Sequence, residues 1–174
     1  MVSTLENIRG YKRECLLTLA LFVVLYALNA YVIGPILQGT AGGAAALITT
    51  TGIFLISPIL AGVYGGYIMA KKDAGKISLL LPAAVIVIGF LLASLPALII
   101  GGMMSEAEFK ERWENSIKAL DNDTRALYEK NGALEYDPEY KNLAVSGLII
   151  SVLMNIPLLF ALGTAGAWIG RRAA

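Results

Sequence analysis

The chain has 174 residues, of which 57% are hydrophobic and only 16% are charged, and its mean hydropathy is +0.68. A soluble domain normally carries about a quarter charged residues, so this composition excludes an ordinary soluble domain and predicts a membrane protein. Basic and acidic residues nearly balance at a net charge of +1. We expect the lipid bilayer to be a partner and nucleic acid not to be one.

Three long stretches of the chain carry no charged residue: 15–70, 77–105 and 142–170. A helix needs roughly 20 apolar residues to cross a bilayer core, so the first stretch is long enough for two spans. The sequence GPILQGTAGGAA, which begins at Gly34, predicts a turn between these two spans. We therefore expect one all-α transmembrane domain, with four transmembrane helices near residues 15–35, 44–70, 77–100 and 143–170.

The first apolar segment follows Lys12 and Arg13 and could be mistaken for a secretory signal. Its apolar core is longer than the roughly 7–15 residues of a signal, so we expect a retained span. We expect Glu14 to lie at the membrane interface beside Arg13. The lone cysteine, Cys15, excludes an intramolecular disulfide and is expected to be a small apolar residue, with palmitoylation as the alternative.

The second and fourth spans share one pattern, seen in SPILAGVYGGYIMAKK from Ser57 and IPLLFALGTAGAWIGRR from Ile156. Each has a proline, an apolar run broken by small residues, an aromatic residue and a basic pair. The pattern predicts two hairpins of the same orientation, as in transporters with parallel repeats. The alternative is that two unrelated helices converged on the same anchoring at the membrane surface.

Glycines recur four residues apart in both of these spans. Gly62 and Gly66 lie in the second span, and Gly163, Gly166 and Gly170 lie in the fourth. Residues four apart share one helix face, and small residues there let another helix backbone approach closely. We expect these glycines to pack the second span against the fourth within one chain. A homo-oligomer contact is the alternative.

The same spans contain prolines beside polar side chains. Pro58 and Pro157 each remove one helical hydrogen bond, which predicts a kink, and Ser57 and Asn155 lie next to them. Together with Asn29 of the first span, these residues are a candidate intramembrane polar site, because broken helices often hold transporter substrates. The alternative is that these polar groups satisfy one another.

The charged residues predict which way the chain crosses the membrane. Eight basic and three acidic residues flank the first apolar segment, join the second and third spans, and end the chain. The segment after the third span carries ten acidic and six basic residues. Because lysine and arginine favour the cytoplasmic side, we expect cytoplasmic N and C termini in a plasma (inner) membrane, with residues 103–142 outside.

The segment SEAEFKERWENSIKAL predicts a helix, because Ser105 and Glu108 form a capping-box pattern at its start. Its apolar residues recur at helical spacing and form one face: Phe109, Trp113, Ile117 and Leu120. We expect this amphipathic helix to lie on the outer membrane surface or to cap the bundle. Binding of a partner protein is the alternative.

The segment DNDTRALYEKNG predicts a second short helix that starts at Asp121 or Asp123 and ends at Asn131–Gly132. Asn122 begins a glycosylation sequon, which matters only in a glycosylating organism. The acidic residues lack the glycine and glutamate spacing of a calcium loop.

The chain contains no histidine, which excludes histidine-based triads and histidine-ligated metal sites. None of the four predicted spans contains a carboxylate. We therefore expect no enzymatic activity, no catalytic residue, no metal site and no cofactor.

The layout resembles small uncharacterised prokaryotic four-helix membrane proteins, with an EFKERW-type insertion between the third and fourth helices and a glycine-rich last span ending in arginines. This resemblance implies no known activity. The packing pattern favours a non-enzymatic assembly or accessory component, as a homo-oligomer or with a membrane-protein partner. The alternative is a small carrier or channel for a neutral solute, an ion or a lipid, which would use the proline-kinked helices.

Overall fold

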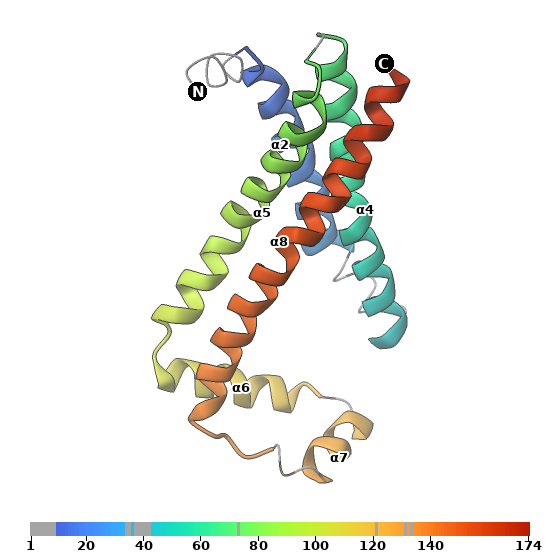
Figure 1. Ribbon diagram of the computed structural model, residues 1–174. Coiled ribbons are helices and arrows are strands. Elements are labelled where there is room, and N and C mark those ends of the chain that lie inside the picture. Colours follow the sequence, from blue (N-terminus) through green and yellow to red (C-terminus); the bar gives the residue numbers. More distant parts are fainter. Residues whose placement is uncertain are drawn as a thin grey trace. The chain divides into compact units, whose positions relative to one another are not determined.

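The computed structural model describes residues 10–33, 36, 43–72, 74–120, 122–130, 132 and 134–174. These residues form helices and no strand, which confirms the all-helical class. In chain order the elements are α2 (Lys12–Leu28), the π-helical turn η1 (Asn29–Ile33), α4 (Gly43–Ala70), α5 (Ile77–Met103), α6 (Glu106–Lys118), α7 (Asn122–Lys130) and α8 (Glu139–Ala173) (Figure 1). The predicted turn around Pro35, together with Asp121 and Asn131, lies outside the described residues.

Within the described residues, three helices are long and apolar enough to cross a membrane: Thr51–Ala70 of α4, α5, and α8. They correspond to the second, third and fourth predicted spans, although α5 and α8 extend beyond the predicted ends. The first predicted span corresponds to α2 continued by η1. Alone, α2 has 17 residues, which is short of the roughly 20 that a span needs.

The chain divides into two compact units. The bundle unit comprises residues up to Ala93 together with Met154–Ala174, and the insertion unit comprises Ser94–Leu153. The insertion unit therefore includes the end of α5 and the start of α8, in addition to the charged segment that the sequence places at 103–142.

Contacts in the bundle unit fix the directions of its first three helices. Thr18 of α2 and Pro82 of α5 both lie against Gly65 of α4. Further along, one aromatic ring from each helix meets the other two, with ring centroids 6.1–6.3 Å apart: Tyr26, Phe54 and Phe90. Residue numbers rise together in α2 and α5 and fall in α4, so α2 and α5 run parallel to each other and antiparallel to α4.

The last helix completes the bundle unit beside α4. Gly62 faces Gly163, and Gly66 faces Ala167, so α8 runs in the same direction as α4. Apolar side chains make up most of the core between the helices, and four of the largest are almost fully buried: Phe22, Met69, Ile86 and Leu159.

The insertion unit contains the capped helix that the sequence predicts. At the start of α6 the Glu108 backbone N–H donates to Ser105 Oγ at 3.2 Å, and the Ser105 backbone N–H donates to Glu108 Oε2 at 2.8 Å. Both bonds of the capping box are present, so this prediction is confirmed. The second short helix, α7, ends just before Gly132, whose φ of 66° is the left-handed conformation common after a helix.

The capping box should weaken in acid. The hydrogen bonds from Ser105 hold the pKa of the Glu108 carboxyl below its ordinary value. The contribution of these hydrogen bonds to the stability of α6 is therefore complete above the ordinary pKa of glutamate. It is lost as the pH falls through the lowered pKa of Glu108. We expect the Ser105 amide resonance to titrate below the ordinary glutamate pKa of about 4.3. A Glu108→Gln variant keeps an acceptor but should show no titration; a flat wild-type signal would contradict this assignment.

Candidate functional site

The glycines of α4 contact the backbone of α8 directly. A Cβ atom added at Gly62 would overlap the carbonyl oxygen of Gly163, and one added at Gly66 would lie 2.6 Å from Ala167 Cα. Real Cβ atoms do not approach other heavy atoms this closely. The two helices are therefore in backbone contact at positions where no larger residue fits.

The glycines of α8 meet α4 in the same way. A Cβ atom at Gly166 would overlap the carbonyl oxygen of Ile59, and one at Gly170 would overlap that of Val63. A Cβ atom added at Gly163 would lie 3.1 Å from Ala83 Cα of α5. The structure thus brings together all five glycines named from the sequence, in what we call the glycine contact: Gly62, Gly66, Gly163, Gly166 and Gly170.

A second close approach, at Gly65, was not predicted from the sequence. A Cβ atom there would lie 2.6 Å from Thr18 Oγ1 and 2.9 Å from Pro82 Cβ. Adjacent helical residues point in different directions, so Gly66 faces α8 while Gly65 faces α2 and α5. The doubled glycine in the sequence is the signal that could have revealed that α4 is closely packed on more than one side.

The candidate polar site occupies several different environments. Ser57 and Pro58 are buried in α4, and the Ser57 hydroxyl donates to the Ile53 carbonyl at 2.9 Å. In α8, Asn155 is half-buried and Pro157 is exposed. Both helices continue through their prolines. The two prolines therefore do not share one environment.

The remaining member of that predicted polar site is Asn29. Its side chain is buried, and it is the first residue of η1. Its backbone N–H donates to the carbonyls of Leu25 and Tyr26. The sequence did not predict this π-helical turn, which interrupts the regular hydrogen bonding at the end of α2.

The bundle unit also contains a buried carboxylate. Glu14 was expected at the membrane interface beside Arg13, but its side chain is only 6% exposed. Its Oε1 lies 2.6 Å from Lys72 Nζ at the end of α4. The Thr18 hydroxyl donates to the Glu14 carbonyl at 2.8 Å. The ion pair joins distant segments of the chain, and neither segment reveals that pairing alone.

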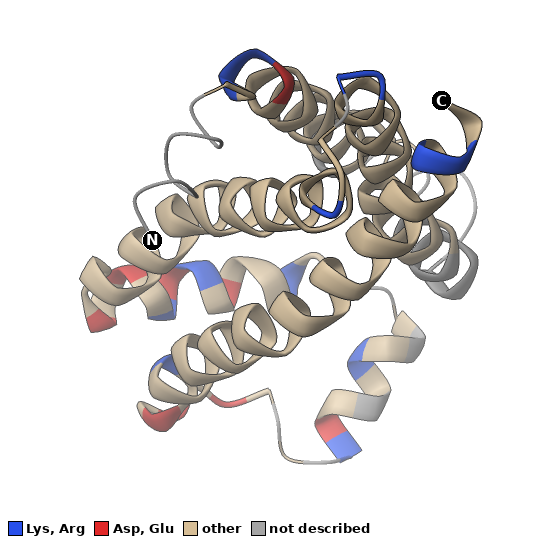
Figure 2. Cartoon of the chain, turned by 45° about the horizontal axis from the view of Figure 1, so that its top comes forward, with Lys and Arg blue, Asp and Glu red and all other residues tan. Residues whose placement is uncertain are grey.

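Two other basic residues at the same end of the bundle unit stack on aromatic rings. Lys71 Nζ lies 4.5 Å from the ring centroid of Tyr67, and the Arg172 guanidinium lies 3.8 Å from that of Trp168. Figure 2 shows blue basic segments at the start of α2, in the α4–α5 connection and at the end of α8. Each exposed cation–π pair contributes about 0.5–1 kcal/mol.

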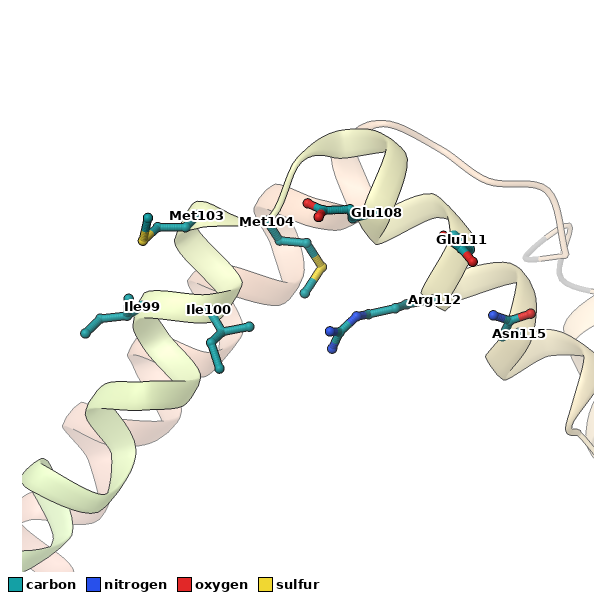
Figure 3. A pocket seen from close by; sticks show the side chains of 8 residues that line it. All are labelled: Ile99, Ile100, Met103, Met104, Glu108, Glu111, Arg112 and Asn115. Atoms are coloured by element: carbon teal, nitrogen blue, oxygen red, sulfur yellow. The ribbon is translucent and has the colours of Figure 1, made fainter.

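The insertion unit has an open recess of about 480 Å³ between the end of α5 and α6 (Figure 3). Four apolar residues of α5 and the following turn line one side: Ile99, Ile100, Met103 and Met104. Four polar residues of α6 line the other: Glu108, Glu111, Arg112 and Asn115. In Figure 3, Ile100, Met104 and Arg112 extend into the space between the helices. The recess is amphipathic and carries charges of both signs.

The apolar face of α6 packs against the first turn of α8 and the segment before it. Phe109 lies 6.3 Å from Tyr136, and Trp113 lies 5.0 Å from Tyr140, measured between ring centroids. Ile117 is half-buried. Leu120 lies just beyond the end of α6 at Lys118. The chain's own aromatic residues therefore contact the face that the sequence assigns to the membrane surface, to the bundle or to a partner.

Two polar atoms of this aromatic cluster are buried without a hydrogen-bond partner among the described residues, Trp113 Nε1 and Tyr136 Oη. Burial also raises the pKa of the Tyr136 hydroxyl above its ordinary value, since the charged form is disfavoured away from water. Amphipathic aromatic residues of this kind are typical of the boundary between lipid and water.

Comparison of the chain with protein-family models, with curated proteins and with solved structures finds no match.

Proposed function

We propose that the protein is a non-enzymatic, multi-pass integral membrane protein that serves as an assembly or accessory component. The glycine contact carries this proposal. In lipid the hydrophobic effect does not drive helices together, so close backbone packing is a principal source of helix association. A backbone contact of this extent favours a fixed scaffold of helices.

The exposed apolar side chains support insertion in a bilayer. Leu80, Ile88 and Leu92 of α5 are each more than half exposed, at 53–55%. Such a surface is unfavourable in water but is matched by lipid hydrocarbon. We propose that α2 with η1 forms a fourth span beside α4, α5 and α8.

The helix directions support two hairpins of the same orientation. α2 and α5 run one way in the bundle unit, while α4 and α8 run the other. In addition, the two patterned helices lie side by side, with Gly62 facing Gly163. This is the arrangement that a parallel repeat would produce around its pseudo-twofold axis.

We propose cytoplasmic termini in a plasma (inner) membrane, with residues 103–142 outside. The charged face of α6 would then be available to a membrane-protein partner or to a second copy of the chain. Ser57, Pro58 and Asn155 line neither the recess between α5 and α6 nor the cavity between the ends of α4 and α8. No described cavity favours the carrier or channel alternative.

Native mass spectrometry of the protein, gently extracted from its own membranes, tests this proposal. We expect a stoichiometric complex, either with a second membrane protein or with further copies of the chain. Its interface should lie outside the glycine contact, which is already occupied within one chain. A monomer that retains one particular small solute would contradict the accessory role and would favour a carrier.

A further inference from the structure

The bundle unit contains a cavity of about 400 Å³. It lies at the end of the unit that holds the start of α2, the α4–α5 connection and the end of α8, which we call the basic end. The lining residues come from the end of α4, the turn before α5, the first turn of α5 and the end of α8: Ala70, Gly75, Ser78, Arg171 and Ala174. This volume lies within the range of about 300–1,000 Å³ that is typical of small-ligand sites. Arg171 is the one charged residue of this lining and the other four are small, so a ligand of modest size can approach its side chain.

The charge around this cavity has one dominant sign. The only described acidic residue at this end is Glu14, and Lys72 already pairs with it. The other charged side chains described here are cations, from the start of α2, the α4–α5 connection and the end of α8 (Figure 2): Lys12, Arg13, Lys71, Lys76, Arg171 and Arg172. Charge complementarity therefore favours an anion over a neutral or cationic ligand.

The cations at this end differ in what they contact. Arg172 stacks on Trp168 and Lys71 stacks on Tyr67, whereas Arg171 lines the cavity and has no carboxylate partner among the described residues. A guanidinium group forms two parallel hydrogen bonds with phosphate. The positive end of the α5 helix dipole, close to Ser78, adds to the attraction for an anion.

We infer that this cavity binds the phosphate of an anionic phospholipid headgroup. The inference rests on the proposed membrane insertion. A lipid is favoured over free phosphate because tyrosine and tryptophan, such as Tyr67 and Trp168, commonly lie at the depth of the lipid headgroups. The cations stacked on these two rings would reach outward to the headgroups. The cavity then lies where a lipid phosphate is held at high local concentration.

Lipid binding by two neighbouring arginine variants tests this inference. Wild type, Arg171→Gln and Arg172→Gln are titrated with phosphatidylglycerol and with phosphatidylcholine in detergent, and the bound lipids are counted by native mass spectrometry. Wild type should prefer phosphatidylglycerol. Loss of a charge-assisted pair of hydrogen bonds should weaken phosphatidylglycerol binding about tenfold in Arg171→Gln. Arg172→Gln has the same net charge as Arg171→Gln. Its affinity for phosphatidylglycerol should stay within about twofold of the wild-type value, because Arg172 does not line the cavity.

A cavity-filling variant tests the same site without changing its charge. Ala174→Leu should also lose the preference for phosphatidylglycerol. Equal losses in both arginine variants would show a diffuse charge effect and overturn the inference, as would a wild type that does not distinguish the two lipids. Binding of inorganic phosphate alone, with the same dependence on Arg171, would overturn the assignment to a lipid. The oligomeric mass in the same spectra tests the assembly proposal separately.

Discussion

Replacing Gly66 or Gly166 with leucine should force α4 and α8 apart and destabilise the bundle unit. At both positions even a Cβ atom would overlap backbone atoms of the facing helix, and backbone cannot rotate aside as a side chain can. We expect a loss of unfolding free energy at or above the upper end of the about 1–3 kcal/mol typical of overpacking. Chemical unfolding in one mild detergent would measure it, and size-exclusion light scattering would report any change in oligomeric mass.

The same two helices offer matched controls for this experiment. A Cβ atom at Gly52 of α4, or at Gly147 of α8, would meet no atom within 4 Å. Gly52→Leu and Gly147→Leu should therefore change stability by less than about 0.5 kcal/mol. If Gly66→Leu and Gly166→Leu keep wild-type stability and mass, the glycine contact does not hold the helices together.

Removing the partner of the buried carboxylate should have the next largest effect. In Lys72→Met, Glu14 would keep its charge in a site where its side chain is only 6% exposed. An unpaired buried charge can cost about 3–5 kcal/mol. Because the Lys72 side chain is itself 52% exposed, we expect a smaller loss of about 1–3 kcal/mol, measured by unfolding in detergent at neutral pH.

Two further variants separate charge pairing from other roles of the lysine. Glu14→Gln combined with Lys72→Met removes both charges and should recover most of the stability, since no unpaired ion remains. Lys71→Met, at the neighbouring position, removes only the exposed stack on Tyr67 and should cost no more than about 1 kcal/mol. A double variant as unstable as Lys72→Met would argue against the ion pair as the cause.

Periodicity and capping patterns predicted most of the helical organisation. The uncharged stretches mark α4, α5 and α8, and the Ser105–Glu108 pattern marks the start of α6, because these signals depend on residues close together in the chain. The first span was harder to place. Its helical hydrogen bonding changes at Asn29, and no local pattern in the sequence marks that change.

The candidate sites were less predictable because their parts lie far apart in the chain. Spacing indicated that Gly62 and Gly66 form a face, but the structure was needed to show that this face meets α8 and that Gly65 meets α2 and α5. The pairing of Glu14 with Lys72 gave no local signal, since each residue alone has the sequence context of an interfacial charge.

The position of α8 at the end of the chain has a consequence for the order of biosynthesis. A chain emerges from the ribosome with its N-terminus first, so α4 is made before the helix that covers its glycine face. Until the last helix follows, Gly62 and Gly66 lack their partners Gly163 and Ala167. Any product that stops after α5 therefore leaves this packing surface open.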